Sequence, residues 1–200
     1  MRFINSNIEP KYDVARSISR LVQPIIITIP VFIILNYFIT GGNNFLIFIL
    51  LCLLFATFLP FTAVLMWIKN KNLDFDITNK DERTFPLLFG VVSYLIGVIM
   101  LFIAGAPAAV TVLMFCYFSN ALLTIFITRF WKISLHSMGV AGPTAAMIYV
   151  FGTPGILFVF PLLMVMWSRI YLNKHTLAQV VVGAISGFVF TWLQFKIFLA

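Results

Sequence analysis

The chain has 200 residues, of which 62% are hydrophobic and 10% are charged. Water-soluble chains are roughly 45–50% apolar and about 25% charged, so this composition excludes an ordinary soluble domain. The apolar residues occur in long unbroken runs, which indicates a multi-span membrane protein. The 13 Lys and Arg against 6 Asp and Glu give a net charge of +7. This positive charge could orient the chain in the membrane, bind an anionic lipid or form a phosphate site.

In chain order, residues 1–20 are expected to form a polar interfacial arm, and residues 21–200 a single transmembrane domain. The domain is expected to be all-α, a polytopic bundle of about six to seven helices. Its apolar runs cover 21–39, 45–68, 87–128 with a hairpin break at 104–107, 138–167 with a break at 152–155, and a last helix that ends near residue 198. The 138–167 run is short for two full spans, so one of its helices should be short. Polar loops at 69–86, 129–137 and 168–175 separate the runs.

The charged residues are expected to gather on one face of the membrane. Each polar loop is separated from the next by an even number of crossings, so the arm and the three loops should share a face. That face would hold all six acidic residues and 12 of the 13 cations, with Lys196 as the exception. By the positive-inside rule this face is cytoplasmic. We therefore expect an integral protein of the bacterial inner membrane, with its loops and its site on the cytoplasmic side.

Cysteine and histidine usage excludes two further classes. Cys52 and Cys116 both lie inside apolar runs, which argues against a secreted disulfide scaffold. No pair of cysteines or histidines has the spacing of zinc ligands, so no metal site and no cofactor are expected. No cleavage site of small residues follows a short apolar core near the N-terminus, so no removable signal peptide is expected.

The three polar loops carry side chains that suit a phosphate group. Arginine presents a planar fork that binds phosphoryl oxygens through paired hydrogen bonds. Histidine can attack phosphorus or transfer a proton near neutral pH. Both histidines fall at expected helix starts, where backbone N–H groups favour an anion. The candidate residues are Lys80, Arg83, Ser134, His136, Arg169 and His175.

The spacing of these residues resembles the type 2 phosphatidic acid phosphatase superfamily of membrane lipid phosphatases. Arg169 follows Ser168 and precedes His175 by six positions, which matches the family motif SRxxxxxH in full. Ser134 and His136 partly match PSGH, and the segment that ends at Arg83 partly matches KxxxxxxRP. The motifs come in the same order, and the resemblance spans about residues 76–187.

The resemblance implies a metal-independent phosphohydrolase that acts on a lipid phosphate or diphosphate, with no nucleic acid as partner. His175 would be the nucleophile, and His136 the general acid that protonates the leaving alcohol. The acyl or prenyl tail would enter laterally between helices. The phosphate oxygens would be held by Arg83, Ser134 and Arg169, with Lys80 in place of the family's lysine.

Several positions depart from the family motifs. Gln179 stands where the family has an aspartate. Because it lies four residues along a helix from His175, its amide oxygen can still accept the Nδ1 hydrogen bond and orient the ring, but it adds no charge. The other departures are Asp76 for the lysine, Thr84 for the proline, and Ile133 and Leu135 for Pro and Gly in the second motif. These changes predict a divergent branch with altered substrate or rate.

Two alternatives from other functional classes stay open. The same basic pocket could bind a phospholipid or polyprenyl phosphate without hydrolysing it, as a transporter, scaffold or assembly partner. Asp74 and Asp76 could instead hold Mg²⁺ for prenyl or phosphoalcohol transfer. No second aspartate cluster completes a two-metal clamp, and these carboxylates also suit pairing with Lys71 and Lys80 as solvated loop charges.

Overall fold

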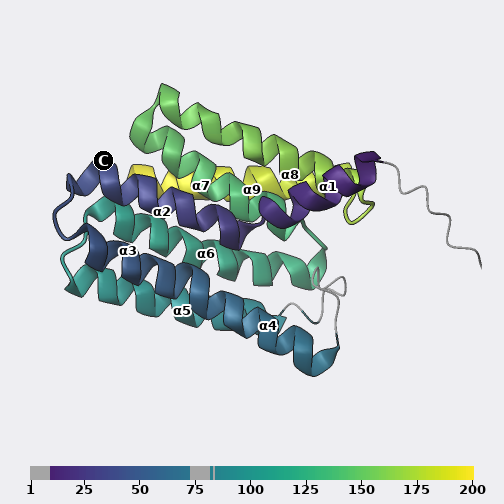
Figure 1. Ribbon diagram of the computed structural model, residues 1–200, viewed down its shortest axis with the longest axis horizontal. Helices are drawn as coiled ribbons and strands as arrows, with labels where there is room; N and C mark the ends of the chain where they lie inside the picture. The colour runs from purple at the N-terminus through teal and green to yellow at the C-terminus, as the bar shows by residue number, and fades with distance from the viewer. Residues whose placement is uncertain (1–9, 73–81, 83) are drawn as a thin grey trace, which may run out of the picture.

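The computed structural model of the chain describes residues 10–72, 82 and 84–200. All regular structure in these residues is helical, and the long helices pack side by side into one bundle (Figure 1). The elements are α1 (Pro10–Leu21), α2 (Pro24–Thr40), α3 (Phe45–Leu53), the π-helical turn η1 (Leu54–Phe58), α4 (Leu59–Lys71), α5 (Thr84–Ile103), α6 (Ala108–Phe130), α7 (Leu135–Phe151), the 3₁₀ turn η3 (Thr153–Phe158), α8 (Val159–Tyr171) and α9 (Leu177–Phe198). The expected all-α bundle is confirmed.

Glycine, asparagine and proline end the helices where the sequence predicts breaks. Gly41, Gly42 and Asn44 all have positive φ in the turn between α2 and α3, a conformation that glycine and asparagine tolerate best. Residues 104–107 separate α5 from α6, and Gly152, at φ +64°, separates α7 from η3. These three turns lie at the same end of the bundle, together with the C-terminus (Figure 1).

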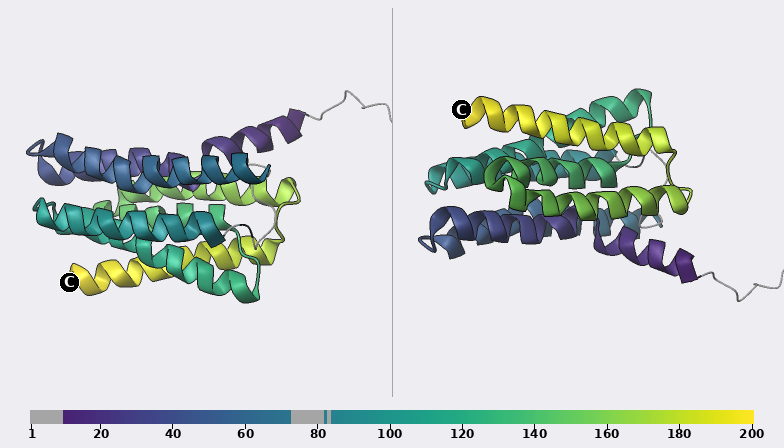
Figure 2. Two further views of the ribbon diagram at one scale, coloured as in Figure 1. Left: turned by 90° about the horizontal axis from the view of Figure 1, so that it is seen from below. Right: turned by 90° about the horizontal axis from the view of Figure 1, so that it is seen from above.

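The first expected run, 21–39, is not one straight helix. Gln23 is extended, with ψ 154°, and α1 meets α2 at a bend of 54°. The cause is Pro24 at the start of α2, because a proline disfavours the α conformation in the residue before it. Residues 10–20, expected as an interfacial arm, therefore form a separate helix that leaves the bundle at an angle (Figure 2).

The polar loops between the later helices are shorter than predicted. α6 continues to Phe130 and α8 to Tyr171, so the segments 129–137 and 168–175 are partly helical. Arg169 consequently lies in the last turn of α8, where it is only 1% exposed. The predicted polar loops were therefore too long at both segments, and in α8 the contacts with Ala15 and Ser19 of α1 cover Ser168 and Arg169.

Five helical segments are long and apolar enough to cross a membrane, or six if α1 and α2 count as one bent span. The helix outside this set is α7, whose 17 residues reach about 26 Å at 1.5 Å per residue. The prediction that one helix of the 138–167 run is short is confirmed. Ten residues of α7 are buried, and it contacts α9, α8, α2 and α6. It is therefore an internal helix with little surface for lipid.

A π-helical turn adjusts the second span next to α5. In η1 the N–H of Leu59 donates to Leu54 O, five residues back. The carbonyl of Phe55 has no such donor, because the residue five positions later is Pro60, which lacks an N–H. The Ser93 hydroxyl of α5 donates to that carbonyl at 2.7 Å. A polar side chain from one span thus satisfies the backbone of another inside the apolar layer.

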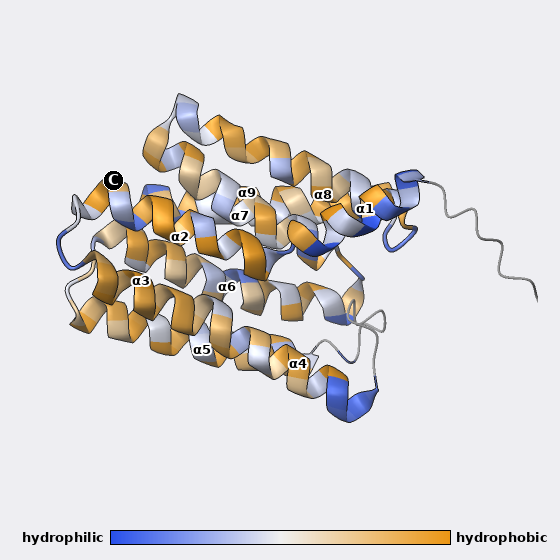
Figure 3. Cartoon of the chain, in the orientation of Figure 1, coloured by the Kyte–Doolittle hydropathy of each residue, from blue (hydrophilic) through white to orange (hydrophobic). Residues whose placement is uncertain are grey.

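The two ends of the bundle differ in the charged residues that they carry, while Figure 3 shows hydrophilic residues near both ends and mostly hydrophobic ones between them. α1, the end of α4, the starts of α5, α7 and α9, and the ends of α6 and α8 lie at one end. Among the described residues this end carries the cations Lys11, Arg16, Arg20, Lys69, Lys71, Arg129, Lys132, Arg169 and Lys174. Lys196, in the last turn of α9, lies at the other. The prediction from loop parity is therefore confirmed for the described residues.

α7 and α9 run parallel and in close contact. A Cβ atom on Gly183 would lie 2.8 Å from the Ser134 carbonyl oxygen, and one on Gly187 would lie 2.4 Å from that of Met138. The contacts repeat every four residues on both helices and continue to Gly142 beside Thr191. Small residues at this spacing permit such an approach between membrane helices. The contact therefore sets both the distance and the register between the two helices.

Replacing Gly187 with Ala should loosen this pair. The new methyl group would overlap a backbone carbonyl that cannot move aside as a side chain could, at an expected cost of about 1–3 kcal/mol in the free energy of unfolding. Denaturation in detergent, followed by circular dichroism, measures the change. Ile185→Ala, at a position 56% exposed on the same helix, is the control and should have the smaller effect. Equal stability of Gly187→Ala and the parent would contradict the close contact.

Candidate functional site

The N-terminal ends of α7 and α9 lie together at the charged end of the bundle. The Ser134 N–H donates to the Gln179 carbonyl at 3.1 Å, which ties the residue before α7 to the first turn of α9. His136 lies in the first turn of α7, and His175 lies two residues before α9. The parallel register of the two helices therefore brings the two histidines, 39 positions apart in the sequence, to one region.

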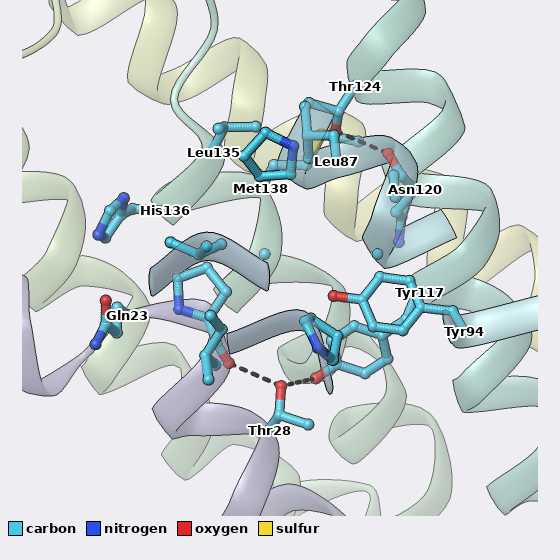
Figure 4. A pocket seen from close by; sticks show the side chains of 18 of the residues that line it. Gln23, Thr28, Leu87, Tyr94, Tyr117, Asn120, Thr124, Leu135, His136 and Met138 are labelled. Atoms are coloured by element: carbon cyan, nitrogen blue, oxygen red, sulfur yellow. Dashed lines mark hydrogen bonds between the residues drawn. The ribbon is translucent and has the colours of Figure 1, made fainter. Parts of the chain in front are cut away.

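A cavity of about 220 Å³ lies beside these helix ends (Figure 4). His136, Arg169 and His175 all line it, and most of the remaining lining is apolar. These three residues come from α7, α8 and the connection between α8 and α9. The structure thus gathers three of the predicted site residues around one space, next to side chains that suit an apolar ligand.

Gln179 holds the ring of His175. Nδ1 of His175 lies 3.1 Å from Gln179 Oε1, and the same oxygen accepts the Thr176 N–H at 3.3 Å. Since a backbone N–H can only donate, the amide oxygen and not its NH₂ group faces Thr176 and His175. Nδ1 of His175 is therefore the donor in this contact. Thr176 and Gln179 together form a capping box at the start of α9, so the cap of the helix also orients the histidine.

Arg169 is held from two sides. Its Nη1 donates to the Ser19 hydroxyl of α1 at 2.7 Å. Its carbonyl oxygen accepts the backbone N–H of Lys174 at 3.1 Å and of His175 at 3.3 Å. The neighbouring Ser168 hydroxyl donates to the Ala15 carbonyl at 2.7 Å. The guanidinium group and the following histidine are thus joined through the C-terminal turn of α8, and α1 covers that turn.

Ser134 was predicted to hold the phosphate oxygens, but it is not among the residues that line the cavity. It is fully buried, and its hydroxyl oxygen accepts the Ser137 N–H at 3.3 Å and lies 2.9 Å from the Ser137 hydroxyl. These contacts make it the N-cap of α7. The cavity is lined instead by Leu135 and His136, which follow it. The predicted residues Lys80 and Arg83, and the acidic residues Asp74 and Asp76, lie outside the described residues.

Polar residues deep in the spans form part of the cavity that sequence reasoning missed. Thr28 donates to the Pro24 carbonyl at 2.7 Å and lies 2.9 Å from the Tyr117 hydroxyl. The rings of Tyr94 and Tyr117 are 5.7 Å apart along one wall (Figure 4), and Asn120 lies on the same helix as Tyr117. The signal that could have found them is the isolated polar side chain inside an apolar run.

Comparisons with known proteins return no match among family models, curated proteins or solved structures. Among the described residues, no group of three or more His, Cys, Asp or Glu is placed to hold a metal ion. Function is therefore inferred from the cavity and the side chains around it. That combination is a positive guanidinium group, two imidazoles and an apolar interior, which suits a ligand with an anionic head and an apolar tail.

Proposed function

We propose that this chain is an integral-membrane phosphohydrolase that acts on a lipid phosphate or diphosphate through a phosphohistidine intermediate. The observation that supports it best is that both histidines of the chain line one cavity with the buried Arg169, at the charged end of a transmembrane bundle. The match of Ser168, Arg169 and His175 to the motif SRxxxxxH, within the resemblance to type 2 phosphatidic acid phosphatases, agrees with this chemistry.

The cavity suits an amphiphilic substrate. Its lining passes from Arg169 and the histidines to apolar residues of α2, α4, α5 and α6, such as Ile25, Val64 and Ala121. A phosphate head group is favoured near the guanidinium, whereas an acyl or prenyl tail is favoured among the apolar side chains. A phospholipid or polyprenyl phosphate combines both parts, and it can enter sideways from the bilayer.

The first chemical step transfers the phosphoryl group to His175. The lone pair on Nε2 attacks phosphorus, and the bond between phosphorus and the lipid oxygen breaks with its electron pair on that oxygen. His136, in its protonated form, donates a proton to the departing oxygen, which leaves as an alcohol. Arg169, with Arg83 and Lys80 as further proposed contacts, stabilises the charge on the phosphoryl oxygens. Gln179 keeps the Nδ1 proton of His175 in place throughout.

The second step returns the enzyme to its first state. His136, now neutral, accepts a proton from a water molecule whose oxygen attacks phosphorus. The bond between phosphorus and Nε2 breaks, and inorganic phosphate leaves. His175 regains its lone pair and His136 its proton, so the net reaction converts a phosphate ester and water into an alcohol and phosphate. The chain's own side chains supply each proton transfer.

A second candidate function is binding of the same lipid phosphate without hydrolysis, as a transporter, scaffold or assembly partner. The hydrogen bond of His175 to Gln179 favours it, because a neutral amide cannot stabilise an imidazolium as a carboxylate does. In serine hydrolases, the comparable loss of an orienting carboxylate lowers the rate by about 10⁴-fold. Slow hydrolysis would be consistent with the proposed phosphohydrolase, whereas binding without any hydrolysis would support the second candidate.

The charged end of the bundle is proposed to face the cytoplasm of a bacterium, with the protein in the inner membrane. Nine of the ten described cations lie at this end, which is the arrangement that the positive-inside rule describes. The phosphate head group would then be cleaved at the cytoplasmic surface.

Removing His175 tests the reaction directly. His175→Ala should lower phosphate release from a panel of lipid phosphates by at least about 10³-fold, because the covalent step is lost. His136→Ala should lower it by about 10²–10⁴-fold through loss of the general acid. Phosphate release by purified protein in mixed micelles is the measurement, and Lys196→Gln, at the opposite end, is the control. Unchanged turnover in His175→Ala would refute the mechanism, and a parent protein that binds vanadate without turnover would support the binding alternative.

Filling the cavity should discriminate between substrates by their tails. Ala121 lines the cavity and is 8% exposed, so Ala121→Phe should lower kcat/KM for a long-chain lipid phosphate by about tenfold or more. Turnover of para-nitrophenyl phosphate, which has no tail, should change little. Leu122→Phe is the matched control, because the neighbouring Leu122 is 42% exposed on the outer surface. An equal loss for both substrates would contradict a tail site.

Sidedness is testable with single added cysteines, because the native Cys52 and Cys116 are buried. Asn43→Cys, in the exposed turn between α2 and α3, should react with a membrane-impermeant maleimide on intact cells. Ser17→Cys, exposed on α1, should react only after the inner membrane is permeabilised. Labelling in the opposite order would invert the proposed orientation.

A further inference from the structure

Helix α1 is attached directly to the part of α8 that carries the arginine of the cavity. Ser19 is 6% exposed and accepts the hydrogen bond from Arg169 Nη1, while Ala15, 0% exposed, accepts the bond from Ser168. Ala15 and Ser19 are four residues apart, so both lie on the same face of α1. Two consecutive residues of α8 therefore hold one face of this helix.

The other end of α1 continues into the wall of the cavity. Gln23 and Pro24, which follow α1 at the bend, both line the cavity with Arg169. Pro24 packs tightly on α7: a Cβ atom on Gly139 would lie 2.6 Å from Pro24 Cγ. Gly139 is three residues after His136, in the next turn of the same helix. A displacement of α1 would therefore act both on the guanidinium and on the wall beside His136.

The outer face of α1 combines cations with apolar side chains. Lys11, Arg16 and Arg20 are exposed against a single acid, Asp13. The same helix exposes the apolar side chains of Tyr12, Val14 and Leu21. A helix of this composition, joined through a two-residue bend to a membrane span, lies in the interface and attracts anionic head groups. Figure 2 shows α1 leaving the bundle at its charged end, where the membrane surface is expected.

We propose that α1 binds the anionic lipid surface of the membrane and that Ser19 is a positioning residue that orients Arg169 in the cavity. The occupant of the basic face is the head-group layer that surrounds the protein, because α1 is tethered to a span and cannot leave that layer. Surface binding keeps α1 against α8, and the hydroxyl of Ser19 then holds the guanidinium toward the phosphate. The role of Ser19 rests on the proposed phosphate site, whereas surface binding by α1 does not.

Binding of orthovanadate, a phosphate analogue, tests the role of Ser19 without requiring turnover. The full-length protein is placed in vesicles of phosphatidylcholine mixed with an equal amount of phosphatidylglycerol, and its affinity is measured by calorimetry. Ser19→Ala should weaken vanadate binding about tenfold, as expected for loss of one hydrogen bond to a charged group. Ser19→Thr keeps the hydroxyl and should stay near the parent. Ser17→Ala, at an exposed serine of the same helix, is the control.

The lipid dependence tests the role of the α1 surface. The parent should bind vanadate more tightly in the mixed vesicles than in phosphatidylcholine alone. The triple variant Lys11→Gln, Arg16→Gln, Arg20→Gln should lose that difference. A bimane label on Tyr12→Cys should report a less polar environment in the mixed vesicles, and this shift should vanish when the three cations are removed. Salt at high concentration should remove both effects, because it screens the surface potential.

Each outcome decides one part of the proposal. Unchanged vanadate affinity in Ser19→Ala, or loss of affinity in both Ser19 variants, overturns the positioning role, since the second pattern indicates packing alone. Absence of vanadate binding by the parent also overturns it. If the bimane label reports the same polarity with and without phosphatidylglycerol, surface binding by α1 is overturned. If vanadate binding depends on Ser19 but no lipid phosphate is hydrolysed, the proposed hydrolysis fails while the role of Ser19 stands.

Discussion

The parallel packing of α7 on α9 is the contact on which the candidate site depends. Gly183 and Gly187 have no side chains, so the backbone of α7 approaches α9 until Ser134 bonds to Gln179. This approach aligns the starts of the two helices and brings their histidines to one cavity. It also explains why α7 is short and rich in small residues, because a helix enclosed by four others has no need to match the thickness of the bilayer.

The bilayer imposes a second constraint, which is that polar groups inside the bundle need partners. The Ser93 hydroxyl satisfies a carbonyl that the proline in the second span leaves without an N–H donor, and the Thr28 hydroxyl contacts Tyr117. Arg169 meets the same requirement through Ser19 on α1. The cavity lining combines Arg169 and the two histidines with mostly apolar side chains and with the polar groups of Thr28, Tyr117 and Asn120. An amphiphilic ligand suits this mixed lining.

Local patterns predict the helices well and their ends less well. Glycine, asparagine and proline mark the turns at 41–44, 104–107 and 152–155, because each disfavours helix continuation on its own. The bend before Pro24 could also have been read from the Gln-Pro pair. The loops predicted around Arg129 and Arg169 were too long, because hydropathy records where apolar residues stop and not where helical hydrogen bonds stop. Arg169 lies in the last turn of α8, where it bonds to Ser19 of α1, 150 residues earlier in the chain.

The amino-acid sequence by itself determines that this protein is an all-α membrane bundle and that nine of the ten described cations gather at one end, because hydropathy and loop parity are properties of the chain in order. It also predicts the hydrogen bond between Gln179 and His175, four residues apart, although His175 lies before α9 and not on it, so the contact forms at the helix cap. Only the tertiary structure decides that α7 lies parallel to α9, that Ser134 bonds to Gln179, and that Ser19 holds Arg169. Each of these contacts joins backbones or side chains from different helices. Their register depends on how closely small residues let those helices approach, which no local pattern encodes.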